Sequence, residues 1–350
     1  MSSIDVVVPC YRYGKYLRAC VESILAQAEV DVRVLILDDE SPDETPLVGA
    51  RLAAEDARVT YWRNPANLGH IDTYNRGLEW AQAPYLLLLS ADDFLLPGAL
   101  GPIARLMDID DALTLCFGNA VVLGADGRQR ETTVNIDCNG SDHRVLSGFE
   151  FMDLSIAAGA SNIVPTPTAV VRTSLIKTYG GYRKDLPHSA DMELWLRLAA
   201  HGSVGFIKKP LAVYRRHADN MSLGYTSDHC LSDLQQRGAA CDEFLRACRD
   251  VVPGIEKIHR RLLRSLALET LGHASSAFNS NQPEQSKRLR ELAIGMHPKV
   301  RLSNAWMALK FKNLIGFKLS SSLLPIVTRW RLGVARVLGS ANPDSPPSAL

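Results

Sequence analysis

Leu86-Leu87-Leu88-Leu89-Ser90-Ala91-Asp92-Asp93 is the most informative stretch of this 350-residue chain. Four consecutive leucines predict a strand that is buried on both faces, as strands are inside a parallel sheet. Two carboxylates follow where that strand should end. Ligands of open α/β sheets bind at the carboxyl ends of strands, and carboxylates there suit a hard divalent cation that holds phosphate oxygens. Alone, the pair is equally compatible with a solvated Asp-Asp turn.

The composition is that of an ordinary folded protein, with 46% hydrophobic and 22% charged residues. The first residues show no basic segment followed by an apolar one, so we expect no signal peptide. No run of about 18 apolar residues occurs, so we expect no membrane-spanning helix. Seven scattered cysteines without a CxxC pair predict reduced thiols, as in the cytoplasm.

Charge is distributed unevenly along the chain. Residues 1–250 carry 24 Lys and Arg against 33 Asp and Glu, whereas residues 251–350 carry 15 against 5. The basic region could face nucleic acid, anionic lipid or the acidic half of its own chain. Within residues 299–336, basic residues alternate with large aromatic ones, a pattern typical of an interfacial membrane helix. A helix packed on the acidic catalytic domain is the alternative, and nothing else in the chain supports nucleic-acid binding.

Strand and helix patterns alternate over the first 120 residues. Apolar runs predict strands at 4–8, 32–37, 59–62 and 85–89, and helical spacing predicts helices at 16–28 and 71–82. This alternation favours a parallel, doubly wound sheet, although no GxGxxG follows the first strand. The segment 113–180 is less regular and predicts loops and short strands. Beyond it we expect a helix at 194–201, strands at 204–207 and 211–214, and helices from 227 onward.

Three predicted strands end in residues that could share one site. Pro9-Cys10-Tyr11 ends the first strand, Asp38-Asp39 the second and Asp92-Asp93 the fourth. The carboxyl ends of parallel strands lie at one edge of a sheet, so these residues can converge on one crevice. A tyrosine ring and a carboxylate suit a nucleobase, and the other carboxylate pair suits a metal that neutralises a diphosphate.

Eight segments over residues 4–222 occur in an order that resembles one known family, the family 2 glycosyltransferases, which are inverting enzymes with a GT-A fold. The segments are Val6-Val7-Val8-Pro9-Cys10-Tyr11, Ser23-Ile24-Leu25-Ala26-Gln27, Leu37-Asp38-Asp39-Glu40-Ser41-Pro42-Asp43, Asn64-Pro65-Ala66-Asn67-Leu68-Gly69, Asn75-Arg76-Gly77-Leu78, Leu89-Ser90-Ala91-Asp92-Asp93, Asp191-Met192-Glu193-Leu194-Trp195-Leu196-Arg197-Leu198 and Tyr214-Arg215-Arg216-His217-Ala218-Asp219-Asn220-Met221-Ser222. The last 125 residues lie outside the resemblance.

The resemblance implies a nucleotide-sugar site at the ends of the first strands. Pro9, Tyr11 and Asp39 would surround the base and ribose of the donor. Asp92, the last position of the family's DXD motif, would coordinate Mg²⁺ or Mn²⁺ that bridges the diphosphate, with Ser90 and Asp93 beside it.

Two further roles follow from the resemblance. Asp191 would be the catalytic base that takes a proton from the acceptor hydroxyl, and His217 would add a metal or phosphate contact. Taken alone, Asp191 would be interpreted as an acidic helix cap. His188 and His201 have no ligand-like spacing and are predicted to be surface residues.

Three positions depart from the family's pattern. Ser90 replaces the usual first Asp of DXD, Ala190 replaces the usual Glu before the base, and Arg12 replaces a frequent Asn. These departures leave open a non-catalytic nucleotide-sugar-binding or interaction protein of the same fold. Nucleotidyl transfer on a similar sheet is a third hypothesis, but no glycine-rich phosphate loop with Arg or Lys occurs near residues 9–20.

The sequence therefore predicts an α/β protein of GT-A type, with a Rossmann-like, mostly parallel sheet flanked by helices and a C-terminal α-helical extension. The expected domains are a catalytic domain at 1–225, a helical region at 226–339 and a disordered tail at 340–350. The expected activity is metal-dependent, inverting transfer from a nucleotide-sugar to a glycan or lipid-linked acceptor, in polysaccharide or cell-surface glycan biosynthesis. We expect a cytoplasmic protein with peripheral contact at the inner face of the membrane and no nucleic-acid partner.

Overall fold

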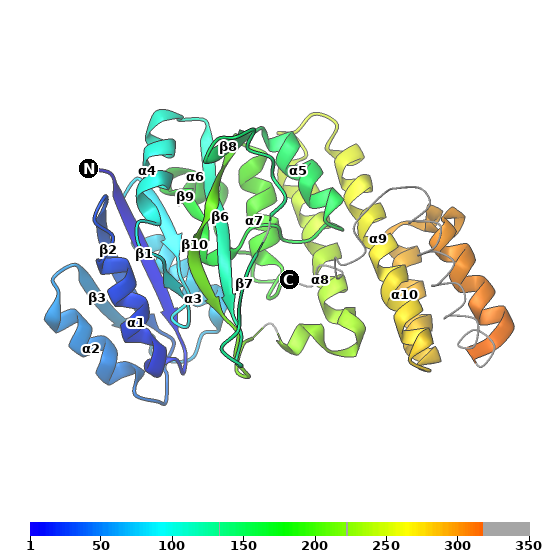
Figure 1. Ribbon diagram of the computed structural model, residues 1–350, viewed down its shortest axis with the longest axis horizontal. Coiled ribbons are helices and arrows are strands. Elements are labelled where there is room, and N and C mark those ends of the chain that lie inside the picture. The colour runs from blue at the N-terminus through cyan, green and yellow to red at the C-terminus, as the bar shows by residue number, and fades with distance from the viewer. Residues whose placement is uncertain (133, 222, 318–350) are drawn as a thin grey trace. The chain divides into compact units, whose positions relative to one another are not determined.

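The computed structural model of the protein describes residues 1–132, 134–221 and 223–317 (Figure 1). The chain divides into two compact units, Met1–Leu266 and Ala267–Leu350. The sequence-based domain limits at 225 and 339 stay predictions, and the tail at 340–350 lies outside the described residues.

The first unit begins with alternating strands and helices. In order these are β1 (Ser3–Cys10), α1 (Gly14–Leu25), β2 (Asp31–Asp38), α2 (Thr45–Glu55), β3 (Val59–Arg63), α3 (His70–Trp80), β4 (Tyr85–Leu88), β5 (Phe94–Leu95), α4 (Leu100–Ile109) and β6 (Leu113–Leu123). It continues with β7 (Gln129–Glu131), β8 (His143–Leu146), α5 (Gly148–Ala157), η1 (Thr166–Thr168), β9 (Val170–Arg172), α6 (Thr173–Tyr179), α7 (Ala190–Ala199), β10 (Ser203–Arg215) and α8 (Leu223–Cys248).

These strands form one mixed sheet in the order β3-β2-β1-β4-β9-β6-β10-β5, with β7 beside β6 and β8 beside β10. Strands β3, β2, β1 and β4 are parallel, as predicted, and so are β6 and β10. Strand β9 is antiparallel to both β4 and β6 and joins the two parallel parts. Because β1, β2 and β4 are parallel, their carboxyl ends meet at one edge of the sheet, which confirms the predicted α/β architecture.

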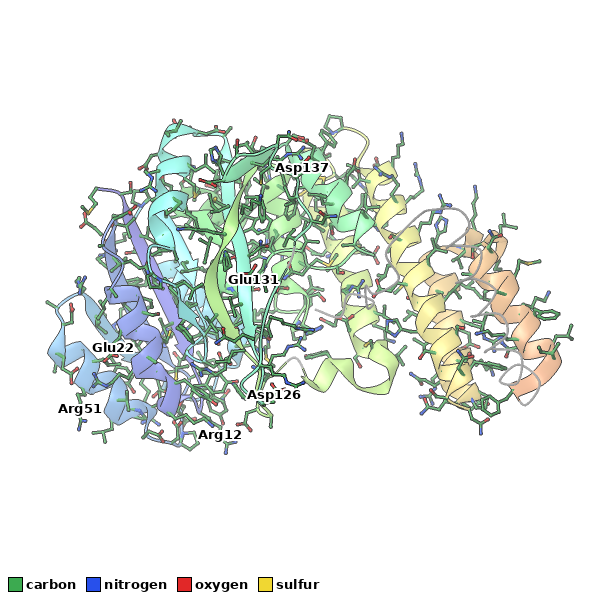
Figure 2. The ribbon with its side chains drawn as sticks, in the orientation of Figure 1. Arg12, Glu22, Arg51, Asp126, Glu131 and Asp137 are labelled. Carbon is green, nitrogen blue, oxygen red and sulfur yellow. The ribbon has the colours of Figure 1, made fainter. Side chains whose placement is uncertain are left out.

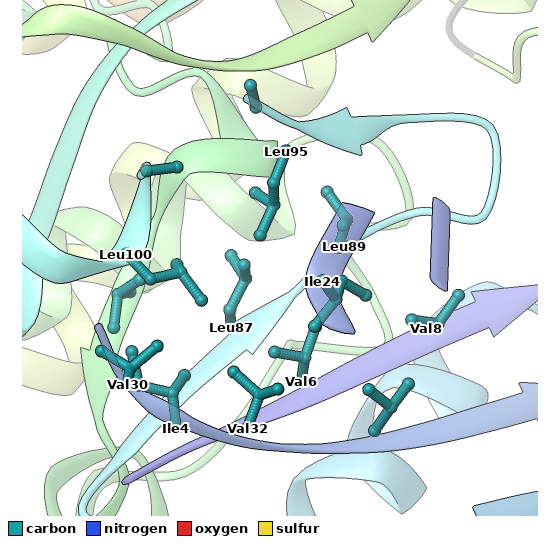
Figure 3. Close-up of a cluster of buried hydrophobic side chains, with 14 of the residues drawn as sticks. Ile4, Val6, Val8, Ile24, Val30, Val32, Leu87, Leu89, Leu95 and Leu100 are labelled. Carbon is teal, nitrogen blue, oxygen red and sulfur yellow. The ribbon is translucent and has the colours of Figure 1, made fainter. Parts of the chain in front are cut away.

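The core follows from the alternation of side chains along β1. Ile4, Val6 and Val8 face one side, where a buried cluster joins the strands to α1 and α4 (Figure 3). Val7 faces the other side, toward α3. A Cβ on Gly77 of α3 would lie 2.3 Å from a methyl carbon of Val7, so only glycine lets this helix approach the sheet so closely.

The segment 113–180 is more regular than predicted. It contains β6, which has 11 residues, and the helices α5 and α6. Gly118-Asn119 interrupts the apolar run of β6, which is why the sequence suggested a shorter strand. The two strands expected at 204–207 and 211–214 are a single strand, β10, whose register with β6 shifts around Pro210.

The boundary between the units falls within α9 (Ile255–Asn279). The second unit continues with α10 (Pro283–Met296), η2 (Pro298–Leu302) and a helix over residues 304–317. Within the described part of the chain, none of the helices combines the length and the apolar character that crossing a membrane requires. Among the described residues, the buried cysteines are free thiols: Cys10, Cys20, Cys116, Cys138, Cys241 and Cys248.

Candidate active site

The edge formed by β1, β2 and β4 carries the predicted nucleotide site. Pro9, buried, pairs in register with Leu37 of β2, and Tyr11 follows with 41% of its surface exposed. Arg12 lies beyond the end of β1, at the lower edge of Figure 2. Its φ of +63° is a left-handed conformation, which Asn adopts more readily than Arg. Its backbone N–H donates to Ser41 Oγ at 3.0 Å.

The two carboxylates that end β2 have different surroundings. Asp38 Oδ1 accepts the Ser41 N–H at 2.8 Å, which stabilises the turn after β2, and its Oδ2 accepts the hydroxyl of Tyr61 on β3 at 2.7 Å. Asp39 Oδ1 accepts from the Asn64 amide at 2.7 Å and from the Leu68 N–H at 2.8 Å.

Asp39 Oδ2 accepts from the Gly69 N–H at 2.9 Å. Asp39 therefore fixes the loop from Asn64 to Gly69 against the end of β2. An oxygen with one donor retains a lone pair for a further N–H, which is compatible with the predicted base contact.

The carboxylates that follow β4 also differ from each other. Asp93 is buried, and its Oδ1 accepts the Arg215 N–H at 2.9 Å, which docks the end of β10. Burial, then the charge of Asp92, raises the pKa of Asp93 well above its ordinary value. Asp92 Oδ2 accepts from His217 Nε2 at 3.1 Å and from Asn220 Nδ2 at 3.2 Å. The fold thus brings His217 and Asp92 together across 125 residues of chain.

The hydrogen bonds of His217 define its tautomer. Nδ1 accepts from the Asp219 N–H at 3.2 Å, so the ring proton lies on Nε2 and is donated to Asp92. The ring stacks on Tyr16 at 5.3 Å between centroids and meets the edge of Tyr13 at 5.4 Å. Two tyrosines of the α1 region therefore hold His217 against Asp92.

Asp92 is compatible with a divalent cation, although the described residues do not provide a complete cage. Among the described residues, Asp92 Oδ1 accepts no hydrogen bond, and no group of three His, Cys, Asp or Glu side chains is arranged as a metal site. Mg²⁺ is commonly bound by one or two carboxylates together with substrate phosphates and water. Coordination by His217 Nε2 would require its proton to move to Nδ1, with loss of the Asp219 bond.

Asp191 lies in the first turn of α7, which begins after Ser189. Its Oδ2 accepts from Asn162 Nδ2 at 2.7 Å and from Thr166 Oγ1 at 3.1 Å. Its Oδ1 accepts the N–H of Met192 at 2.7 Å. Burial is the largest influence on its carboxyl and raises the pKa above the ordinary value, while the hydrogen bonds partly oppose this. A raised pKa makes a carboxylate a better proton acceptor.

Tyr74 was not predicted as a site residue. Burial raises the pKa of its hydroxyl, and the charges of Asp92 and Asp191 raise it further, so both carboxylates lie within electrostatic range of Tyr74. Its ring meets Tyr182 edge-on at 5.3 Å. The neighbouring Asn75 bonds the backbone of Tyr182 through its amide nitrogen at 2.9 Å and its oxygen at 2.8 Å.

The profile of the family described as Glycosyl transferase family 2 matches residues 5–180. The chain belongs to this family. The uncharacterized protein MT1568 of Mycobacterium tuberculosis (strain CDC 1551 / Oshkosh) is 30% identical over 217 residues, which is 61% of this chain and 67% of that protein.

This family 2 glycosyltransferase is also similar to a chondroitin synthase and to the structure of TarS. Chondroitin synthase of Pasteurella multocida (strain Pm70) is 24% identical over 222 residues, 63% of this chain but only 21% of that protein. The crystal structure of S. aureus TarS 1–349 in complex with UDP-GlcNAc has a TM-score of 0.54 and 16% identity, covering 86% of this chain and 92% of that one. This likeness shows the GT-A fold.

In this glycosyltransferase the segment before α7 differs from its sequence-based prediction. His188 is mostly buried and its Nε2 lies 2.9 Å from Asp233 Oδ1, so it is not a surface residue. His201 is stacked on the ring of Tyr179 at 3.4 Å. Asn162 and Thr166, which contact Asp191, were also missed, because they lie in an irregular segment with no periodic signal.

Proposed function

We propose that the chain is a metal-dependent, inverting glycosyltransferase that moves a sugar from a nucleotide-sugar donor to a glycan or lipid-linked acceptor. The observation that carries the proposal is the pair of carboxylates Asp92 and Asp191. Asp92 contacts His217 and Asn220 beyond the end of β4. Asp191 accepts hydrogen bonds from Asn162 and Thr166. Asp92 has a carboxylate oxygen, Oδ1, that accepts no hydrogen bond from the described residues. The pKa of the Asp191 carboxyl is raised above its ordinary value.

The comparisons support a donor of this class. The TarS structure contains UDP-GlcNAc, and chondroitin synthase is named for a polysaccharide product. We extend these properties to this chain as proposals: a nucleotide-sugar donor, and a role in polysaccharide or cell-surface glycan biosynthesis.

The residues of the site have distinct tasks in the proposed reaction. Mg²⁺ or Mn²⁺ held by Asp92, with His217 as a second contact, would neutralise charge on the leaving diphosphate. Pro9, Tyr11 and Asp39 would bind the base and ribose, with Ser90 and Asp93 completing the nucleotide-sugar site.

Asp191 would accept the proton of the acceptor hydroxyl as the oxygen attacks the anomeric carbon. A positioned base of this kind contributes about 10²–10⁴-fold to the rate. A single displacement from the face opposite the leaving group inverts the configuration at that carbon.

A panel of nucleotide-sugars tests the proposal. Incubation with Mn²⁺ should release nucleoside diphosphate from at least one donor, by transfer or slow hydrolysis, and EDTA should prevent it. Release of pyrophosphate would instead indicate nucleotidyl transfer. Donor binding without turnover at any metal would favour a non-catalytic protein of the same fold.

We also propose that the second unit contacts an anionic membrane surface. On the helix over residues 304–317, Met307, Phe311 and Leu314 lie on one face and are 60%, 59% and 83% exposed. Exposed Lys310 flanks this face. Apolar side chains beside cations are what an interfacial helix requires. The rest of the predicted basic stretch, residues 318–336, lies outside the described residues.

Replacing Phe311 and Leu314 together by Ser should weaken binding to anionic vesicles about tenfold or more, because burying each side chain contributes about 1.5–3 kcal/mol. Co-sedimentation with anionic and neutral vesicles measures this. Leu47→Ser, at a 64% exposed leucine of α2, is the matched control and should bind like the unmodified protein. Failure of the unmodified protein to bind anionic vesicles at low salt would contradict the membrane contact.

A further inference from the structure

The catalytic base of this chain lacks the acidic neighbour that the family pattern places before it, because Ala190 occupies that position. Its carboxylate is nevertheless held on both oxygens. Met192 N–H bonds Oδ1, while Asn162 and Thr166 bond Oδ2 from a segment between α5 and β9. The residues that orient the base therefore come from a different part of the chain.

The amide of Asn162 has a defined orientation. Its Oδ1 accepts the Val164 N–H at 2.9 Å, which leaves Nδ2 directed at Asp191 Oδ2, 2.7 Å away. A flipped amide would lose the Val164 bond and would place one oxygen against another. Asn162 is thus a fixed donor to the base.

The backbone that leads to Asn162 has an uncommon conformation. Gly159 and Ala160 both have positive φ, of +84° and +57°. Such a conformation is unfavourable for alanine and persists only where the surroundings stabilise it. The buried side chain of Arg237, on α8, provides that support: Nη2 donates to Gly159 O at 2.7 Å and Nε to Ala160 O at 3.1 Å.

Helix α8 also contacts the segment just before the base. Asp233 accepts from Arg237 Nη1 at 3.0 Å through one oxygen and lies 2.9 Å from His188 Nε2 through the other. The His188 N–H donates to Gln236 Oε1 at 3.3 Å. Three residues of α8 (Asp233, Gln236 and Arg237) therefore contact both segments that flank the site of Asp191.

We propose that Asn162 is the positioning residue of the catalytic base and that Arg237 of α8 holds Asn162 in place, so that α8, outside the part matched by the family profile, completes the active site. The inference rests on the proposed function of Asp191 as the base. Asp233 contacts both Arg237 and His188, so it also helps to hold the segments that flank Asp191.

The titratable groups around Asp191 influence how its pKa should change when the hydrogen bond from Asn162 is lost. His188 faces it from the preceding segment, Tyr74 from α3 and Tyr182 from the loop after α6. None of them replaces the bond from Asn162. Loss of that bond removes a donor that stabilises the carboxylate, so the pKa of Asp191 should rise.

The experiment compares Asn162→Ala and Arg237→Met with Arg261→Met in the full-length protein. Arg261 makes an exposed ion pair with Asp153 of α5 and does not contact the 159–162 segment, so it is a matched arginine control. Both test variants should lower kcat about tenfold and leave the donor KM unchanged, because the base is misplaced and the donor site is intact. The acidic limb of the kcat profile should move to higher pH by about one pH unit.

A second readout needs no substrate. In protein labelled with ¹³C at aspartate carboxyls, with Asp191→Asn as the assignment reference, the Asp191 titration should move upward in Asn162→Ala and Arg237→Met but not in Arg261→Met. An unchanged titration in both test variants would overturn the inference. Absence of turnover by the unmodified protein with every donor would refute the proposed function, while the carboxyl titration would still decide this inference.

Discussion

Replacement of Asp92 by Ala should abolish turnover and metal-dependent nucleotide binding, with a loss of about 10³-fold or more in kcat/KM. The physical reason is that a cation at this edge of the sheet needs at least one direct carboxylate. Ser90, at the position of the other usual acid, has no charge to replace it. Calorimetric titration of a nucleoside diphosphate with and without Mn²⁺ measures the binding loss.

The isosteric Asp92→Asn variant separates charge from packing. The amide oxygen can still accept from Asn220 or His217, so the fold and its melting temperature should be retained while the metal effect is lost. Asp126→Ala, at an exposed aspartate (Figure 2), is the control and should behave like the unmodified protein. Near-normal activity of either Asp92 variant would show that the metal assignment is wrong.

Asp191→Asn should have a different effect, lowering kcat by about 10²-fold or more with donor affinity unchanged, because only the proton acceptor is lost. In the unmodified protein the pKa of Asp191 is raised by burial, so activity should fall as pH decreases through that raised value. The variant should lack this acidic limb. Steady-state kinetics over a pH series, with donor binding measured separately, gives both results.

The same raised pKa gives a stability prediction for Asp191→Asn. A group whose pKa is higher in the folded state stabilises the protein below its unfolded pKa, and this contribution is lost as pH rises through the folded value. At neutral pH the ionised carboxylate therefore costs stability. Its removal offsets the hydrogen bond that Asn loses where its NH2 replaces an accepting oxygen, so the variant should melt close to the unmodified protein. A variant with weakened donor affinity and normal kcat would instead assign Asp191 to the binding site.

The first half of the fold could be predicted because local patterns and tertiary structure agree there. Apolar runs mark β1, β2 and β4; Asp39 directly follows β2, and Asp92 lies a few residues beyond the end of β4. The sheet topology beyond β5 could not be predicted, since β9 follows β6 in the chain but inserts between β4 and β6 in the sheet. Periodicity contains no information about such an insertion.

The candidate site, like the fold, could be predicted only in part from the sequence. The resemblance pointed to Asp92, His217 and Asp191, and the structure places the first two 3.1 Å apart, while their roles as ligands stay predictions. Tyr74 and Asn162 could not be identified, because their importance depends on what lies across the site. A neutral amide in an irregular loop has no sequence signal of its own.

A crystal structure with a soaked nucleoside diphosphate and Mn²⁺ would test the proposed site as a whole. We predict an anomalous manganese peak coordinated by Asp92 and by the diphosphate, with the base near Tyr11 and Asp39 and the diphosphate end directed toward Asp191. A nucleotide bound elsewhere, or a diphosphate that does not share a metal with Asp92, would contradict it.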